Sequence, residues 1–226
     1  TALKGQLDER EKRAIVVNHL QTTHAAGLAK IADRLVNAPL AAQAATQSYS
    51  LLTDCLVRLV YQLATEKFHT AATPTNGERL TLIAVGGYGR GEMALYSDVD
   101  LLFLTPYKMT PWSESVIETM LYILWDMRLK IGHASRSLRE CLRLGTEDFT
   151  IRTAMLERRY LCGDVALADA LDHSLWQDLF QGTEREFIEA KLEEREARHE
   201  KQGGQRYLVE PNVKEGKGGL RDLQSL

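Results

Sequence analysis

The first 70 residues carry apolar side chains at the mixed three- and four-residue spacing that is typical of amphipathic helices. One such stretch runs from Leu7 to Leu35 and is interrupted by Asn37-Ala38-Pro39. A second runs from Ala41 to Phe68. We therefore predict two helices that form a lead-in over residues 1–70, and none of their residues suggests catalysis.

The pattern changes between Leu80 and Thr105, which reads LTLIAVGGYGRGEMALYSDVDLLFLT. Two short apolar runs rich in β-forming residues, Leu80–Gly86 and Val99–Thr105, lie on either side of a glycine-rich stretch. This pattern predicts a strand, a tight turn and a second strand.

Helical periodicity returns after the second strand and is interrupted once, where Leu129–Ser135 predicts a third strand. Strands set among helices predict an α+β fold, with a core over residues 71–160. We expect residues 161–226 to form a helical extension and the start of a following region. The chain ends in a glycine-rich, loop-like stretch. The helices predicted after the second strand are Trp112–Arg128, Ser137–Leu144, Glu147–Arg158 (with Gly145 separating these two), Asp164–Phe180 and Glu184–Gln202.

Composition narrows the class of protein. The 226 residues allow one large domain or two small ones, and 44% apolar with 26% charged residues is ordinary for a soluble globular chain. The net charge of −3 argues against a protein that follows the backbone of a nucleic acid. No apolar run is long enough to span a membrane, so we expect neither nucleic acid nor membrane as a partner.

The three cysteines, Cys55, Cys141 and Cys162, are far apart and form no Cys-x-x-Cys motif. This spacing argues against a zinc site and favours a reducing, cytoplasmic location. The chain starts without Met, and its charged beginning has no signal-peptide core. We expect it to be a piece of a longer protein.

Two carboxylates open the second strand. Side chains at i and i+2 of a strand point the same way, so Asp98 and Asp100 should project together. The two carboxylates of such a pair repel each other unless a cation lies between them. Mg²⁺ bound by paired carboxylates is the usual catalyst for nucleophilic displacement at a phosphorus atom. Gly86 and Gly87, just upstream, allow backbone N–H groups to approach an anion closely. Together these residues predict a nucleoside triphosphate site.

Two further residues of this stretch have alternative roles. Arg90 could pair with a phosphate oxygen, or it could form a salt bridge to Glu92 or another neighbour. Ser97 could donate a hydrogen bond to a phosphate, or it could be a cap or turn residue.

Other glycine-loop sites fit less well. A Walker A loop needs a lysine after its glycines, and none follows here. Gly89–Ala94 matches a dinucleotide-binding fingerprint, but the acidic residues follow too soon and lie at the start of a strand.

The glycine pair followed by Asp98-Val99-Asp100 resembles the signature of the DNA polymerase beta-like nucleotidyltransferase superfamily. The longer block GGYGRGEMALYSDVDLLFL resembles the PII uridylyltransferase/uridylyl-removing family of bacteria. The resemblance covers Leu80 to Leu226. Further agreement comes from Gly132–Ser137, Ala154–Arg159, Glu210–Gly216 and Gly218–Gln224.

This resemblance implies a small mixed sheet of the polymerase beta-like fold, flanked by helices. It implies transfer of UMP from UTP to a tyrosine of the PII signal protein, with release of pyrophosphate, in nitrogen regulation. A separate hydrolase domain of the HD type and ACT domains are implied downstream, so this stretch alone should be weakly active or inactive. Asp98 and Asp100 would be the catalytic pair holding two Mg²⁺ ions, and the nucleotide-binding residues would be Gly86, Gly87, Arg90 and Ser97.

One departure concerns the metal ligands. Many members of the superfamily carry a third carboxylate on the next strand, whereas Leu129–Ser135 has none. Asp126, Glu140 and Asp148 remain open as candidates. His133 could line the site or be structural, and we expect Glu157 to pair with an arginine.

Two alternatives to this function remain open. The chain could be a nucleotidyltransferase with a different acceptor, or a nucleotide-binding regulatory module without catalysis. The presence of both Asp98 and Asp100 favours an enzyme.

Overall fold

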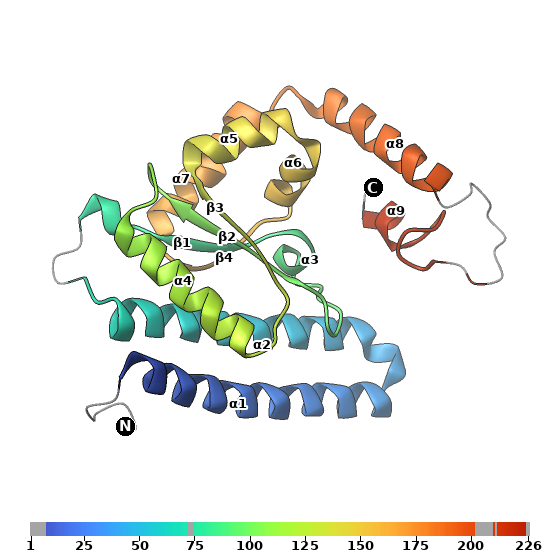
Figure 1. The fold of residues 1–226 in the computed structure, drawn as a ribbon. Helices are drawn as coiled ribbons and strands as arrows, with labels where there is room; N and C mark the ends of the chain where they lie inside the picture. The colour runs from blue at the N-terminus through green and yellow to red at the C-terminus, as the bar shows by residue number, and fades with distance from the viewer. Residues whose placement is uncertain (1–7, 72–74, 202–209, 211, 225–226) are drawn as a thin grey trace.

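The computed structural model describes residues 8–71, 75–201, 210 and 212–224. A four-stranded sheet, with strand order β3-β2-β1-β4, lies between two groups of helices. Helices α1, α2 and α4 lie on one side of the sheet, and α5, α6 and α7 lie on the other (Figure 1). The arrangement confirms the predicted α+β class.

The two N-terminal helices form much as predicted. Helix α1 (Glu9–Asn37) is capped by Asp8, whose carboxylate accepts a 2.7 Å hydrogen bond from the Glu11 N–H. A short 3-10 helix, η1 (Pro39–Ala41), leads into α2 (Ala42–Leu63), and a π-helical stretch, η2 (Ala64–Phe68), extends α2.

The sheet is mixed. Strand β2 (Val99–Thr105) is parallel to β3 (Ile131–Ser137), and α4 (Pro111–Asp126) forms the crossover between them. Strand β1 (Thr81–Ala84) is antiparallel to both of its neighbours, β2 and β4 (Arg159–Gly163). The predicted bounds of β1, β2 and β3 agree with the observed ones within two residues at each end.

Strand β4 corrects the prediction, which assigned no element to residues 159–163 and continued a helix to Arg158. Helix α6 (Phe149–Leu156) ends earlier, and the chain then enters the sheet edge as β4. Antiparallel pairing of Ala84 with Arg159 begins this contact.

The sheet has an apolar core on each face. Val99, Leu101 and Phe103 of β2 belong to a cluster with α1, α2 and α4, whereas the alternating Leu102 and Leu104 belong to the cluster on the other face. That second cluster includes residues of α5 (Leu138–Glu147), α6, α7 (Val165–Leu175) and the π-helical η4 (Trp176–Phe180). The lead-in helices therefore share a core with the sheet, while the division at residues 70 and 160 stays a prediction.

Gly145 does not separate two helices, contrary to the prediction. It lies buried within α5, where an added Cβ would be 2.6 Å from Cδ2 of Leu179. The glycine allows α5 to pack closely on η4, and the break comes three residues later at Asp148, which caps α6.

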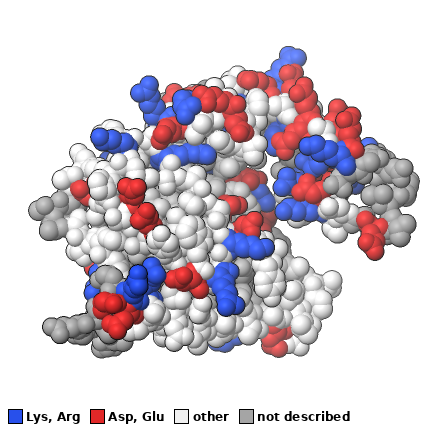
Figure 2. Space-filling model, in the orientation of Figure 1, with Lys and Arg blue, Asp and Glu red and all other residues white. Residues whose placement is uncertain are grey.

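The C-terminal part extends away from the sheet. Helix α8 (Glu184–Lys201) is highly charged, and its predicted Glu194–Arg198 pair is present at 3.9 Å. The chain then returns as a compact glycine-rich turn and a short helix, α9 (Leu220–Gln224). Part of the predicted loop, residues 202–209 and 211, lies outside the described residues. Figure 2 shows acidic and basic side chains interleaved over this region.

Two further observations concern the whole described chain. None of its helices combines the length and apolar character needed to cross a bilayer. Cys55, Cys141 and Cys162 are all free thiols.

Candidate functional site

The two predicted carboxylates lie at the start of β2. Asp98 precedes the strand and is exposed, whereas Asp100 is its second residue and is half-buried. Burial raises the pKa of Asp100, and the nearby negative charge of Asp98 raises it further. The structure therefore brings the two carboxylates together, on the sheet face covered by α5, α6 and α7.

Two glycines leave room for the Asp100 carboxylate. Gly132 is its register partner on β3, and a Cβ there would lie 2.2 Å from Oδ1 of Asp100. A Cβ at Gly86 would lie 3.4 Å from Oδ2. Gly86 also has a positive φ of 60°, which other residues adopt with difficulty. Gly132 belongs to the Gly132–Ser137 stretch that resembles the family, and no local pattern predicts its contact with Asp100.

The glycine-rich stretch, predicted as a tight turn, forms one helical turn, α3 (Gly86–Gly89). The Gly89 N–H donates to the carbonyl of Val85 at 3.0 Å, and the Arg90 N–H donates to that of Gly86 at 3.1 Å. The first N–H groups of a helix have no partner within it, so those of Gly86 and Gly87 are suited to an anion. Val85 donates its own N–H to the Asp100 carbonyl at 3.1 Å, which ties this turn to β2.

Arg90 forms an ion pair with Glu157 and lies 3.6 Å from a carboxylate oxygen of Glu92. The salt-bridge alternative for Arg90 is thus present, and the expected arginine partner of Glu157 is confirmed. Contact with a phosphate stays a prediction for Arg90.

Ser97 occupies a turn just before Asp98. Its N–H donates to the carbonyl of Ala94 at 3.1 Å, and the intervening Tyr96 has a positive φ of 67°. The turn interpretation of Ser97 agrees with this geometry, and its nucleotide contact stays a prediction.

The three candidates for a third carboxylate have structural partners elsewhere. Asp126, at the end of α4, lies 3.4 Å from Arg13. Glu140 caps α5 by accepting from the Ser137 N–H at 2.8 Å, and Asp148 caps α6. Among the residues that the structure describes, no group of three or more His, Cys, Asp or Glu side chains is placed to hold a metal ion.

His133 is exposed and lies edge-on to Trp125 of α4, with ring centroids 6.0 Å apart. It follows Gly132 in β3 and therefore points to the opposite sheet face from Asp100. This position agrees with the structural interpretation of His133.

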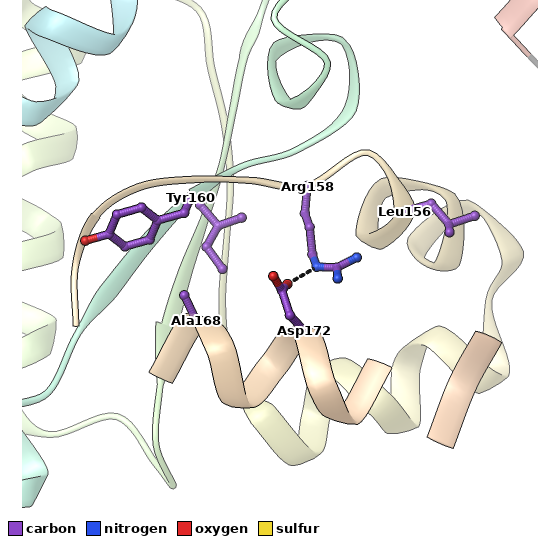
Figure 3. Close-up of a pocket in the computed structure, with 6 residues that line it drawn as sticks. Leu156, Arg158, Tyr160, Ala168 and Asp172 are labelled. Carbon is purple, nitrogen blue, oxygen red and sulfur yellow. Dashed lines mark hydrogen bonds and ion pairs between the residues drawn. The ribbon is translucent and has the colours of Figure 1, made fainter. Parts of the chain in front are cut away.

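Two pockets lie on the Asp100 face of the sheet. One, of about 240 Å³, lies between β4, α6 and α7, and Arg158 and Asp172 form an ion pair in it (Figure 3). The other, of about 150 Å³, is nearer to the carboxylates, because its lining includes Val85 and Leu101, which adjoin Gly86 and Asp100. Neither pocket is lined by Asp98 or Asp100.

Two family models match the chain. The model for glutamate-ammonia ligase adenylyltransferase matches residues 1–129, and the model for GlnD PII-uridylyltransferase matches residues 186–226. The first match includes the glycine turn and both carboxylates, and the second covers α8 and α9.

Curated relatives match nearly the whole chain. Bifunctional uridylyltransferase/uridylyl-removing enzymes of Ruegeria pomeroyi and Cereibacter sphaeroides are 61% and 57% identical, over 97% and 98% of this chain. The enzyme of the same name from Novosphingobium aromaticivorans is 50% identical over 95% of the chain. The chain spans 24% of the length of each of these three relatives. We conclude that the chain belongs to the PII-uridylyltransferase family and aligns with about a quarter of the length of these relatives.

Proposed function

We propose that this site, in the full-length protein, transfers UMP from UTP to a tyrosine hydroxyl of the PII signal protein in the cytoplasm. The observation that carries the proposal is the position of Asp100, whose carboxylate lies between Gly132 and the first glycine of α3. A carboxylate that can bind a cation thus adjoins a helical turn whose N–H groups can bind phosphate. Nucleotidyl transfer needs a cation site and a phosphate site that lie within the length of one triphosphate.

The donor set fits Mg²⁺. Asp98 and Asp100 offer carboxylate oxygens, the ligands that Mg²⁺ prefers. Burial and, to a lesser degree, repulsion by Asp98 raise the Asp100 pKa, and a cation would relieve that repulsion. Bound there, Mg²⁺ would neutralise triphosphate charge and make the acceptor hydroxyl easier to deprotonate.

The other residues would bind and orient the nucleotide. Gly86 and Gly87 would donate N–H groups to phosphate oxygens, and the Ser97 hydroxyl would donate another hydrogen bond. Arg90 would exchange Glu157 for a phosphate when UTP arrives. The tyrosine oxygen would then form a bond to the α-phosphorus of UTP. The bond between the α-phosphorus and the oxygen that bridges it to the β-phosphorus would break, and pyrophosphate would leave with that electron pair.

A second candidate is transfer of AMP from ATP to a different protein acceptor. The adenylyltransferase family model supports it, because its match over residues 1–129 includes the whole glycine turn and the carboxylate pair. The matches over nearly the whole chain to uridylyltransferases favour UTP and PII.

The test measures initial rates of labelling of purified PII by the full-length protein, with Mg²⁺ and either labelled UTP or labelled ATP. We expect label from UTP, and at least a hundredfold slower labelling by Asp98→Asn and Asp100→Asn. Asp169→Asn, an exposed carboxylate on α7, is the matched control and should label PII at the wild-type rate. Label on PII from ATP alone would overturn UTP as the donor, and PII that stays unlabelled with both nucleotides would favour the second candidate. Undiminished labelling by Asp100→Asn would refute the proposed site.

A further inference from the structure

Helix α2 carries buried polar side chains on the side that faces the glycine turn. Ser50 and Asp54 lie four residues apart, one helical turn, and are only 4% and 6% exposed. No pattern in the sequence links α2 to the site. A buried carboxylate is costly unless it is paired, so the partner of Asp54 is informative.

That partner is Arg159, the first residue of β4. Its Nη1 lies 2.6 Å from Oδ2 of Asp54, and its Nη2 lies 3.0 Å from Oδ1. A two-bonded pair of this kind fixes the plane of the guanidinium as well as its position.

The other side-chain hydrogen bonds of Arg159 are with α3. Its Nε donates to the Gly89 carbonyl at 3.2 Å, and Nη2 donates to the Tyr88 carbonyl at 3.0 Å. The guanidinium also lies 5.4 Å from the centroid of the buried Tyr88 ring. Arg159 thus binds the C-terminal carbonyls of the turn, whose N-terminal end adjoins Asp100.

Neighbouring contacts hold the same turn from other sides. The Ser50 hydroxyl accepts the Met93 N–H at 3.2 Å, just after the turn. The Glu157 carbonyl lies against Gly89, where a Cβ would be only 1.7 Å from it. Contacts from α2 and from the chain entering β4 therefore set the orientation of α3 relative to the sheet.

We propose that Asp54 and Arg159 are positioning residues, which hold α3 in the orientation that places Gly86 against the Asp100 carboxylate, where a triphosphate would bind. Arg159 acts through the backbone of Tyr88 and Gly89, and Asp54 acts through Arg159. The inference rests on the proposed function, since the triphosphate of that reaction would bind beside Asp100. With this role for Asp54, helix α2 contributes to nucleotide binding.

The test uses Arg159→Gln, Arg159→Lys and Asp54→Asn in the full-length protein. The matched control is Arg79→Gln. Arg79 forms an equally two-bonded pair with Asp164, at 2.5 and 3.1 Å, at the opposite end of β1 from α3. The control therefore removes a comparable pair without touching the turn.

Three quantities are compared: the dissociation constant for UTP with Mg²⁺ by calorimetric titration, amide hydrogen exchange over residues 86–93, and the melting temperature. Arg159→Gln should weaken UTP binding about tenfold and speed exchange of these amides about tenfold. Arg159→Lys should recover part of the affinity, because lysine keeps the charge but not the planar fork. Asp54→Asn should resemble Arg159→Lys, and Arg79→Gln should lower the melting temperature alone.

The outcomes separate the two proposals. UTP affinity and exchange in Arg159→Gln that match the Arg79→Gln control would overturn the positioning role, whether or not UMP is transferred. Wild-type protein that binds UTP but leaves PII unlabelled would overturn the proposed acceptor alone. Wild-type protein that binds no nucleoside triphosphate would overturn both.

Discussion

The carboxylate of Asp100 occupies the space that a side chain on residue 132 would need, since a Cβ there would lie 2.2 Å from Oδ1. The parallel register of β2 and β3 sets the two residues side by side. At this point β3 supplies a glycine, and the Asp100 carboxylate fills the space beside it.

Gly132→Ala should therefore push the Asp100 carboxylate out of place. We expect at least a tenfold loss of UMP transfer by the full-length protein and destabilisation of about 1–3 kcal/mol from overpacking. Initial rates and denaturant unfolding measure the two effects. Gly77→Ala is the control, because its Cβ would meet neighbours at an ordinary 3.5 Å. Wild-type transfer by Gly132→Ala would contradict the geometry.

Asp100→Asn should stabilise the metal-free protein at neutral pH. The folded-state pKa of Asp100 is raised above 3.8, so folding stability falls as pH rises from 3.8 through the raised value, and the charged form is the unfavourable one. Removing this charge should add about 0.5–2 kcal/mol. Thermal melts should show that Mg²⁺ stabilises the wild type but not the variant. An equal Mg²⁺ effect in both proteins would exclude Asp100 as a ligand.

Gly89→Ala should disrupt the packing of α3. The new Cβ would lie 1.7 Å from the Glu157 carbonyl oxygen, a backbone atom that cannot move aside cheaply. We expect destabilisation of about 3 kcal/mol, the upper end for overpacking, in chemical unfolding. Gly87→Ala, whose Cβ would meet only Nη2 of Arg90 at 3.6 Å, should retain near wild-type stability. Equal stability of the two variants would count against this packing.

Asp222→Asn should loosen the C-terminal turn from α8. Asp222 accepts from the Gly218 N–H at 2.7 Å and from Arg198 at 2.6 Å, and it lies 2.9 Å from Nε2 of His199. Burial alone would raise its pKa, but these partners lower it to about 2. Since the ordinary value is 3.8, the contact stabilises the fold above pH 3.8 and is lost as pH falls through about 2.

At pH 7 this substitution should cost about 1–3 kcal/mol of local stability, because charged hydrogen bonds are removed. Hydrogen exchange over residues 212–224 measures it. Glu193→Gln, an exposed carboxylate on α8, should leave that exchange unchanged. Unchanged exchange in Asp222→Asn would mean that other contacts hold the turn.

Local patterns predicted most of the fold. Val99–Thr105 was predicted to the residue because a buried strand between turn residues has an unambiguous pattern. Strand β4 was missed because Arg159–Gly163 follows a helical pattern with no turn signal before it, and only pairing with β1 makes it a strand. Gly145 was misread because glycine breaks many helices, whereas here tertiary packing against Leu179 requires it.

Part of the candidate site could be predicted from local sequence patterns, and part could not. Asp98 and Asp100 are near neighbours, so strand alternation alone predicted that they lie together. Gly132 lies 32 residues beyond Asp100 in the numbering, and Asp54 lies 105 residues before Arg159. No local periodicity reports such contacts, so only the structure could reveal them.

The Asp54–Arg159 pair also bears on how the protein is made. Its partners are 105 residues apart, so the contact cannot form until synthesis has passed β4. Chains fold as they emerge, and non-local contacts form late because a long loop must close first. The glycine turn, although complete in sequence by residue 91, should acquire its final orientation only when the edge strand docks. During synthesis, the chain would therefore become able to bind a triphosphate only after most of its secondary structure has formed.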